Sequence, residues 1–465
     1  MKIGISIFCL IFLLARCVER PPTIDQPPIL PSPSGIRETA VPNEKTEIGS
    51  VRPTQSPSPS SRSQSSTSLR FLDVFSITPI PQDGNIEVNC ISESTPPEID
   101  SDANGIIPIL ERVNSRDGLL LDLQTGNASI LNKGEKDVLT AFSVSTDRKW
   151  LSYETIIKND KGQIISKNVT ITSASEQIGE IPINDQWYSP HWVNNDELLF
   201  TLAEPDTESP GYDRYPPALI LFNPFSGQTQ KLEPDFPDIL SLDPSMQWGL
   251  DGLTVYDPTM KRVVYGYGTS KEGSSYRIWD MQANNLIATI SSGEWLPGAP
   301  PIWSNDGSKF ALNLDVNGSE LYSISREGEK EQLTNFKSYL RPGYTISHYV
   351  WSPNNNSLAF YIQPYDAISK QWGEYTLVLY DFSSRKTIFT CVYSDYGGKA
   401  IGQFSGDPQP PIWSPDGSML LIEQRHELEK SRLLLINLNK NQLYNLGENL
   451  QPFGWLSSTP ENISP

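Results

Sequence analysis

The sequence predicts an all-β fold, a seven-bladed β-propeller with four antiparallel strands in each blade. Two observations carry this prediction. A short motif with a Trp directly before a polar turn recurs every 40 to 60 residues. Each copy is followed by short apolar or alternating runs with almost no helical periodicity. A unit of this size cannot bury its own core and must pack on copies of itself, as propeller blades do.

The motif spans residues 192–196, 303–307, 351–355 and 413–417, and residues 455–458 begin in the same way. Aligning the units on their turns gives seven equivalent positions: Val144, Trp192, Val255, Trp303, Trp351, Trp413 and Trp455. We expect each Trp to pack between neighbouring blades, where one indole buries on the order of 200 Å². Asp306-Gly307 and Asp416-Gly417 fit tight turns in which Gly accepts a positive φ. The motif is therefore interpreted as structural rather than catalytic.

The two ends of the repeat region complement one another. Trp455 supplies a first strand, whereas residues 106–113, 118–123 and 128–131 supply second, third and fourth strands that have no first strand before them. Together they make one blade shared between the N- and C-terminal segments, beside six continuous blades. Closing the ring in this way removes exposed sheet edges.

Residues 301–308 (PIWSNDGS) and 411–418 (PIWSPDGS) resemble the WD40-like repeats of the TolB type, which also build the propellers of prolyl-oligopeptidase-type peptidases. The resemblance covers about residues 105–456 and implies a propeller only. It is weak at Val144 and Val255. The α/β domain of TolB has no counterpart here, so the partners of that family are not carried over.

The N-terminus has the layout of an export signal. Lys2 precedes an apolar run, Ile3 to Leu14, that is too short to span a membrane comfortably. Leu14 to Cys17 resembles a bacterial lipobox, although Arg16 replaces the usual small residue, so lipidation of Cys17, plain cleavage and an uncleaved anchor remain alternatives. Residues 18–70 are rich in Pro and Ser and predict a disordered tether. The expected organisation is a signal at 1–17, the tether at 18–70, a segment packed on the propeller at 71–104, the propeller at 105–457 and a tail at 458–465.

Only Cys90 and Cys391 remain in the folded part of the chain. In an oxidising compartment they can form one disulfide, which would join the segment before the repeats to the fifth unit. Two separately buried thiols are the alternative.

The formal net charge of −19 disfavours nucleic acid and anionic lipid as partners. Membrane contact is expected only through the N-terminal anchor, and we expect a monomer. The expected location is extracytoplasmic, either anchored in the cell envelope or secreted.

Long insertions fall almost entirely on one face of the predicted ring. Residues 204–216, 364–374 and 426–431 join second to third strands, and residues 233–247 and 393–409 join blades. Long loops on one face of a rigid scaffold usually mark its working surface. They carry an aromatic and acidic set of candidate binding residues: Asp206, Tyr212, Asp213, Arg214, Tyr215, Tyr365, Asp366, Trp372, Glu374, Tyr393, Asp395 and Tyr396. Such a mixture suits a protein, a peptide or a glycan, although these aromatic residues could instead only anchor the loops.

Catalytic signatures are scarce. His191, His348 and His426 have no metal-ligand spacing, and no Gly-x-Ser-x-Gly elbow occurs. A carbohydrate-active lyase or glycosidase built from dispersed channel carboxylates is the alternative to a binding module, and a purely structural envelope scaffold is a third interpretation. No cofactor is expected apart from calcium. Asp100, Asp102, Asn104 and Glu111 match the spacing of an EF-hand loop, but the flanking prolines favour a solvated turn.

Overall fold

The computed structural model describes residues 85–93, 103–111, 118–131, 137–159, 161, 164–174, 177–183, 187–202, 218–232, 255–269, 273–293, 300–314, 319–338, 340, 343–366, 371–394, 409–427 and 430–457. The chain divides into two units, residues 1–48 and 49–465, and every described residue belongs to the second. Within these ranges no helix is long and apolar enough to cross a bilayer.

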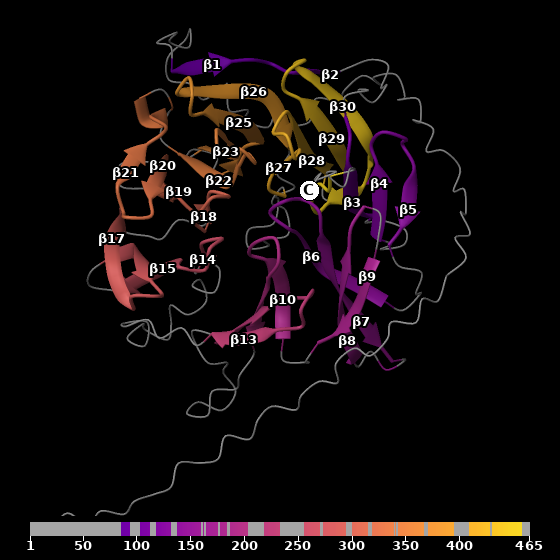
Figure 1. Cartoon of the computed structure of the whole chain (residues 1–465). Helices are drawn as coiled ribbons and strands as arrows, with labels where there is room; N and C mark the ends of the chain where they lie inside the picture. The colour runs from indigo at the N-terminus through magenta and orange to yellow at the C-terminus, as the bar shows by residue number, and fades with distance from the viewer. Residues whose placement is uncertain are drawn as a thin grey trace, which may run out of the picture. The chain divides into compact units, whose positions relative to one another are not determined.

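The second unit is a ring of seven antiparallel four-stranded blades, as the sequence predicts (Figure 1). Blade 1 contains β6 (Asp137–Val144), β7 (Leu151–Lys158), β8 (Ile164–Thr172) and β9 (Gln177–Pro182). Blade 2 contains β10 (Trp187–Trp192), β11 (Leu198–Leu202), β12 (Ala218–Phe222) and β13 (Thr229–Leu232). Blade 3 contains β14 (Val255–Tyr256), β15 (Arg262–Thr269), β16 (Gly273–Asp280) and β17 (Asn285–Gly293).

Blade 4 contains β18 (Ile302–Trp303), β19 (Lys309–Leu314), β20 (Glu320–Ser325) and β21 (Lys330–Gln332), followed by the short 3₁₀ helix η4 (Phe336–Ser338). Blade 5 contains β22 (Tyr344–Trp351), β23 (Ser357–Asp366), β25 (Tyr375–Asp381) and β26 (Lys386–Ser394), with β24 (Gln371–Trp372) paired to the end of β23. Blade 6 contains β27 (Ile412–Trp413), β28 (Met419–Glu427), β29 (Lys430–Asn437) and β30 (Gln442–Glu448).

Blade 7 is shared between distant parts of the chain. Its first strand is β31 (Leu450–Pro452), and the other three are β3 (Ile106–Glu111), β4 (Gly118–Asp122) and β5 (Ala128–Ile130). β31 pairs with β3, and a further bridge joins Leu456 to Ile106. The composite closing blade predicted from the sequence is therefore confirmed.

The core lies between blades because each second strand is buried on both faces. In β23, Leu358, Phe360 and Ile362 pack in a cluster with residues of blade 4. Ala359 and Tyr361, on the opposite face of the strand, pack with Trp413 and other residues of blade 6. Alternate side chains of a strand point to opposite faces of its sheet, so one strand contributes to two interfaces.

One aligned position differs from the sequence-based expectation. In blade 4, Trp303 pairs with Phe310, and the amide of Ser304 then bonds to the carbonyl of Lys309. In blade 3 it is Tyr256 that pairs with Val263, and Asp257 that bonds to Arg262. Tyr256 therefore occupies the Trp position, and the assignment of Val255 is wrong by one residue. The Asp257 carboxylate organises this turn by accepting hydrogen bonds from the amides of Lys261 and Arg262, a pattern that differs from the Trp-turn motif.

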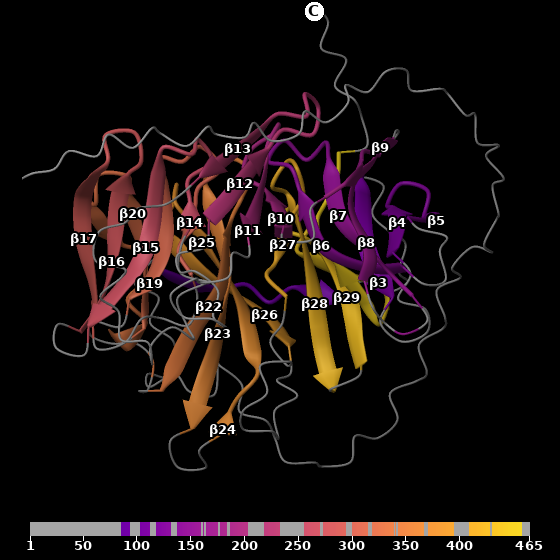
Figure 2. The same ribbon diagram turned by 90° about the horizontal axis from the view of Figure 1, so that it is seen from below.

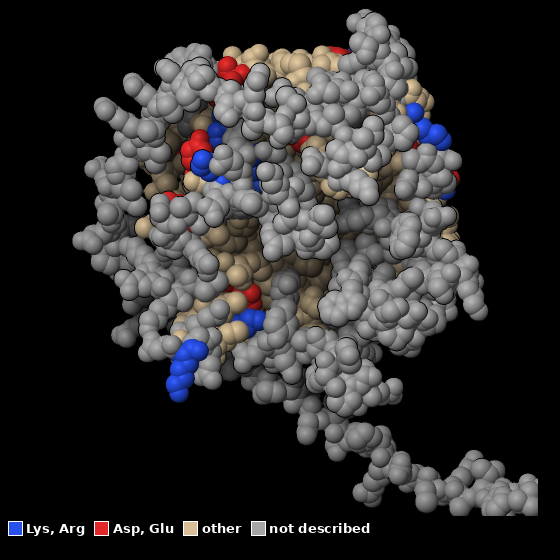
Figure 3. Space-filling model, turned by 180° about the vertical axis from the view of Figure 1, so that it is seen from behind, with Lys and Arg blue, Asp and Glu red and all other residues tan. Residues whose placement is uncertain are grey.

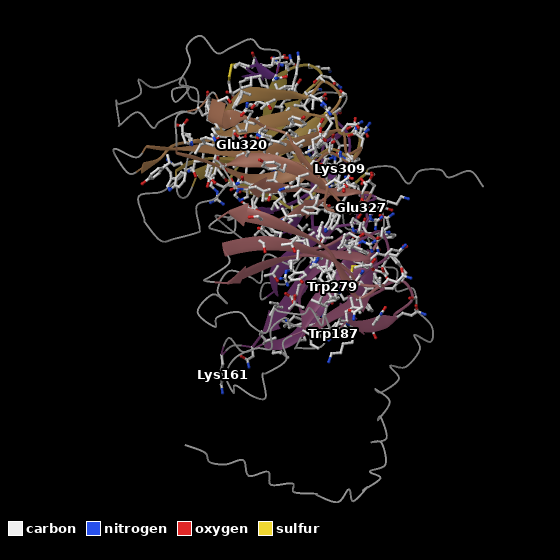
Figure 4. All side chains as sticks on the ribbon, turned by 90° about the vertical axis from the view of Figure 1, so that its left-hand side faces the viewer. Lys161, Trp187, Trp279, Lys309, Glu320 and Glu327 are labelled. Atoms are coloured by element: carbon white, nitrogen blue, oxygen red, sulfur yellow. A yellow bond between two sulfur atoms is a disulfide. The ribbon has the colours of Figure 1, made fainter. Side chains whose placement is uncertain are left out.

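Residues 85–93, hereafter the strap, run along the outer edges of two blades. β1 (Ile86–Val88) adds a parallel strand to β26 in blade 5, and β2 (Ser92–Glu93) adds one to β30 in blade 6. Between them Cys90 forms a disulfide with Cys391 of β26, the pairing rather than the separate thiols that the sequence left open (Figure 4). The strap is therefore bound to blade 5 both covalently and through the sheet.

Candidate functional site

The face on which second strands end, and on which blades are joined, is called the long-loop face. β24 and the end of β28 project from this side of the ring (Figure 2). Figure 3 views the molecule from this side, and uncharged residues line the hollow near its middle. Most of the predicted insertions on this face lie outside the described residues, so the site is built from blades 5 and 6.

The insertion at residues 426–431 is not the loop that the sequence suggests. β28 continues to Glu427 and β29 begins at Lys430, and these two residues pair. The ladder also includes Arg425 opposite Ser431. Because backbone pairing continues outward, blade 6 ends in a tight hairpin.

In blade 5 the predicted insertion is a hairpin that presents two aromatic rings. Tyr365 at the end of β23 pairs with Trp372 of β24, and their ring centroids lie 4.8 Å apart at an interplanar angle of 49°. Trp372 is 44% exposed, whereas Tyr365 is half-buried. The hairpin thus offers an indole supported by a second ring, an arrangement that can contact a partner with little loss of side-chain entropy.

Backbone bonds hold this hairpin to the blade. The amide of Gly373 donates to the carbonyl of Pro364 at 2.8 Å, and the Gln363 side-chain amide donates to the carbonyl of Gly373 at 3.1 Å. The amide of Tyr365 donates to the carbonyl of Gly343 at 2.5 Å. Gly343 has φ +100°, and a Cβ there would lie 2.7 Å from the carbonyl oxygen of Tyr365. Only glycine fits this approach.

Deeper in blade 5, the innermost strand carries a strained histidine. His348 has φ +54° and lies at a bulge between Ser347 and Val350, where the pairing of β22 with β23 shifts register. Its Nδ1 lies 2.9 Å from the hydroxyl of Ser347, and its ring lies 6.3 Å from both Tyr361 and Tyr375. Bulges re-aim side chains and are common near functional sites.

A related bulge occurs in two other first strands, between Thr140 and Ser143 in β6 and between Tyr188 and His191 in β10. Ala141 has φ +50° at the position equivalent to His348. Since the distortion recurs in blades with different side chains, it belongs to the shape of the inner wall. In blade 5 it places a histidine against two tyrosine rings.

Tyr361 and Glu423 occupy equivalent positions in the second strands of blades 5 and 6. Burial raises the pKa of the Tyr361 phenol, and the negative charge of Glu423 raises it further. Within the described part of the chain the Tyr361 hydroxyl has no hydrogen-bond partner. Arg425 lies 3.3 Å from the Glu423 carboxylate, and both side chains are buried. The wall under the hairpin therefore combines an ion pair with a neutral phenol.

Two other buried carboxylates have partners in the scaffold. Glu154 of β7 pairs with Lys167 of β8 at 3.1 Å. Glu320, at the start of β20 and toward the opposite end of blade 4 from Lys309, caps η4 (Figure 4). It accepts hydrogen bonds from the amides of Phe336 and Lys337 and from the hydroxyl of Thr334. These contacts hold both carboxylates in place inside the scaffold.

The structure brings together some of the predicted binding residues. Tyr365 and Trp372 are in contact, and Asp366 follows Tyr365 in β23. Glu374 is buried at the base of the hairpin. Tyr393 is half-buried in β26, where its carbonyl accepts a hydrogen bond from the Gln424 side chain. The remaining predicted residues lie outside the described part of the chain: Asp206, Tyr212, Asp213, Arg214, Tyr215, Asp395 and Tyr396.

The four residues with EF-hand spacing are only partly described. Asp100, Asp102 and the lipobox residue Cys17 lie outside the described residues. Asn104 and Glu111 flank almost the whole of β3, an extended strand that rises about 3.3 Å per residue, so these two side chains do not share one loop. The Asn104 carbonyl accepts a hydrogen bond from Trp455 at 3.0 Å. Among the described residues, no group of three or more His, Cys, Asp or Glu could hold a metal ion.

Sequence reasoning missed the wall formed by His348, Tyr361, Glu423 and Arg425. A usable signal was present, because Glu423 follows the apolar run Met419 to Ile422 in a strand that is otherwise core. A charged residue at a core position requires a partner. The partner, however, could be identified only from the pairing of the strands.

No protein-family model matches the chain, and no curated protein is similar to it. Solved structures with some similarity include TolB from Acinetobacter baumannii, at 12% identity over 75% of this chain and 81% of that one, with a TM-score of 0.38. An oligogalacturonate lyase from Vibrio parahaemolyticus matches at 10% identity over 74% and 86%, with a TM-score of 0.44. A periplasmic gluconolactonase from Pseudomonas aeruginosa matches at 12% identity over 77% and 99%, with a TM-score of 0.43.

Proposed function

We propose that this propeller is a binding module that contacts a protein, peptide or glycan through its long-loop face. The exposed Trp372, backed by Tyr365, is the observation that carries this proposal. A large apolar ring held rigid at the surface loses little entropy on binding and contributes strongly to interfaces. The buried Glu423–Arg425 ion pair belongs to the wall under this hairpin.

The test compares Trp372→Ala with Leu286→Ala. Leu286 lies in β17 on the outer edge of blade 3 and is 42% exposed, close to the exposure of Trp372. Partners are sought by pull-down from cell-envelope extract and on glycan and peptide panels, with both variants at equal concentration. We expect Trp372→Ala to weaken binding at least about tenfold, a loss of about 1.4 kcal/mol. Leu286→Ala should bind like the parent chain.

Equal binding by the two variants would remove Trp372 from the contact surface. The rival function, a carbohydrate-active enzyme using carboxylates of the channel, gives a different result. In that case the purified chain would turn over a glycan in the same panel, and the rate would depend on buried acids rather than on Trp372. A chain that binds nothing and turns over nothing would favour a structural scaffold.

We also propose that the protein is exported and held to the cell envelope by its N-terminus. The Cys90–Cys391 disulfide supports this location, because disulfides persist in oxidising compartments. Mass spectrometry of the mature N-terminus tests the anchor. An acylated Cys17 would establish a lipoprotein, whereas a free residue beyond it would indicate simple cleavage.

A further inference from the structure

The strap pairs with blade 5 in a defined register. Ile86, Glu87 and Val88 lie opposite Thr387, Ile388 and Phe389, and the Cys90–Cys391 disulfide continues the same register two residues later. The amide of Thr387 donates to the carbonyl of Asn85, and the amide of Asn89 donates to the carbonyl of Phe389. Along blade 5, odd-numbered strap residues therefore bond to the sheet, so the N–H groups of Ile86 and Val88 point away from it.

The strap pairs in the same parallel way with the outer strand of blade 6, and the strap residues at equivalent positions differ by seven in number. Lys386 and Gln442 are equivalent because each pairs with the residue that opens the preceding turn, Asp381 and Asn437 respectively. Ser92 lies opposite Gln442 and Glu93 opposite Leu443, whereas Ile86 lies opposite Thr387. Glu93 is thus the counterpart of Ile86. From blade 5 to blade 6 the strap therefore advances by seven residues.

The outer edge of blade 4 lies next to the start of the strap (Figure 1). A groove of about 380 Å³ separates this edge from blade 5. Leu333, Phe336 and Tyr380 give it apolar walls, Glu331 and Arg385 form an ion pair across it, and Asn85 and Ile86 of the strap line its end. Among the described residues, β21 has no strand on its outer side. Asn85, the first described residue of the strap, therefore lies at this groove.

We propose that residues 78–82 extend the strap onto blade 4 as a parallel strand along β21. Asp381 of blade 5 and Ser325 of blade 4 hold the same position, at the turn between the third and fourth strands of their blades. In the fourth strands, Thr387 therefore corresponds to Lys330, and Ile388 corresponds to Glu331. Glu87 lies opposite Ile388. The residue seven positions before Glu87 is Ile80, so Ile80 would lie opposite Glu331. Glu331 faces blade 5, as its ion pair with Arg385 shows. Ile80 then points into the groove between blades 4 and 5.

The sequence of this segment suits the position. In the same register, Pro79 and Pro81 correspond to Ile86 and Val88, whose N–H groups point away from the sheet. Proline lacks this donor and is tolerated on edge strands only where the N–H would face outward. Ile80 would bury its side chain against Leu333, Phe336 and Tyr380. Only Asp83 and Gly84 separate residues 78–82 from Asn85, so attachment to the strap gives this segment a high effective concentration at the groove.

The first experiment is a cross-link in the full-length chain. Ile80→Cys combined with Glu331→Cys copies the in-register geometry of Cys90 and Cys391, whose Cα atoms lie 4.8 Å apart. Ile80→Cys combined with Lys231→Cys is the matched control, because Lys231 lies in the outer strand of blade 2. After mild oxidation, peptide mapping by mass spectrometry should find the first disulfide in most molecules and the second at background level. Equal yields for the two pairs would overturn the proposal.

The second experiment needs no new disulfide. Ile80→Asp would place a carboxylate in an apolar groove beside Glu331, so we expect a lower Tm and faster amide exchange in β21. Ile80→Val should restore both, and Ile77→Asp, one residue before the strand, should leave both unchanged. If Ile80→Asp matches the parent chain in both measurements, this segment does not occupy the groove. A second copy of the chain or a foreign strand would then be its occupant.

Discussion

The indole Nε1 of Trp351 donates a hydrogen bond to the carbonyl oxygen of Ile302, 2.9 Å away in the preceding blade. The same bond recurs at two neighbouring interfaces, from Trp303 to Val255 at 3.1 Å and from Trp413 to Val350 at 3.3 Å. Each acceptor directly precedes the Trp position of its own blade. In blades 4, 5 and 6 the Trp therefore joins the backbone of one blade to the next, in addition to filling the interface between them.

Replacing Trp351 should separate these two contributions. Trp351→Phe keeps a ring but removes the hydrogen bond to the Ile302 carbonyl, so we expect a loss of about 1 kcal/mol in the free energy of unfolding. Trp351→Ala also opens a cavity and should cost about 3–5 kcal/mol. Guanidinium denaturation measures both, and Trp372→Phe is the control because that indole lies at the surface. A Trp351→Phe variant as stable as the parent would show that the indole N–H is dispensable.

The turns after Trp303 and Trp413 make the stability of the fold depend on pH. Burial opposes ionisation of Asp306, but hydrogen bonds from Ser304 and Ser308 prevail and lower the pKa of its carboxyl. Asp416 behaves alike, with Ser414 and Ser418 as donors. A lowered pKa in the folded state stabilises the fold above the pKa of the unfolded chain, about 3.9. This contribution is lost as the pH falls through the folded pKa.

We therefore expect Asp306→Asn with Asp416→Asn to lower the denaturation midpoint at pH 7 and to differ less from the parent at pH 2.5. Asp196→Asn, which removes an exposed carboxylate from the equivalent turn of blade 2, is the control for charge alone. A difference that stays constant between the two pH values would contradict the role assigned to these carboxylates.

The sequence was sufficient for the architecture because the motif acts as a spacing marker. Counting Trp-turn units predicts seven blades, and the unmatched strands at residues 106–131 predict the shared blade. The local register of blade 3 was harder to predict. Asp257 organises its turn at the position where blade 4 has Ser304, and the alignment from the sequence is therefore wrong by one residue. The end of blade 6 was mistaken for a loop because polar side chains such as Arg425 and Ser431 hide a continuing backbone ladder.

The candidate site was predictable only in part. Aromatic residues in an insertion point to a contact surface, and Tyr365 and Trp372 do meet there. The buried wall beneath them depends on contacts between blades, which no local pattern encodes. Tyr361 and Glu423, for example, are 62 residues apart in the sequence, and only the equal position of both residues in neighbouring strands brings them together. The parallel pairing of the strap is equally non-local.

Reducing Cys90–Cys391 should loosen the strap before the propeller. Removing a disulfide typically costs about 2–4 kcal/mol. Here the strap also covers the edges of β26 and β30, so the amide of Thr387, which bonds to Asn85, should exchange faster with solvent. Hydrogen exchange and Tm with and without reductant measure the two effects. Cys90→Ser should behave like the reduced chain and show no further response, whereas a parent chain unaffected by reductant would argue against a fastening role.

The buried pair of Glu154 and Lys167 joins blade 1 to blade 2. Lys167 Nζ lies 3.1 Å from the Glu154 carboxylate and donates at 2.9 Å to the carbonyl of Trp187 in β10. Thr140 of β6 donates to the other carboxylate oxygen at 2.9 Å. Removing one member of a buried ion pair leaves a charge without compensation, which typically costs about 3–5 kcal/mol.

We therefore expect Lys167→Met to destabilise the fold by that amount, and Glu154→Leu to have a comparable effect. The double variant should be less destabilised than the sum of the single variants, with a coupling energy of about 0.5–3 kcal/mol. Guanidinium denaturation of the four proteins gives this cycle directly. Strictly additive losses would mean that the two charges do not stabilise one another, and that the contact between Lys167 and the Trp187 carbonyl alone joins the blades.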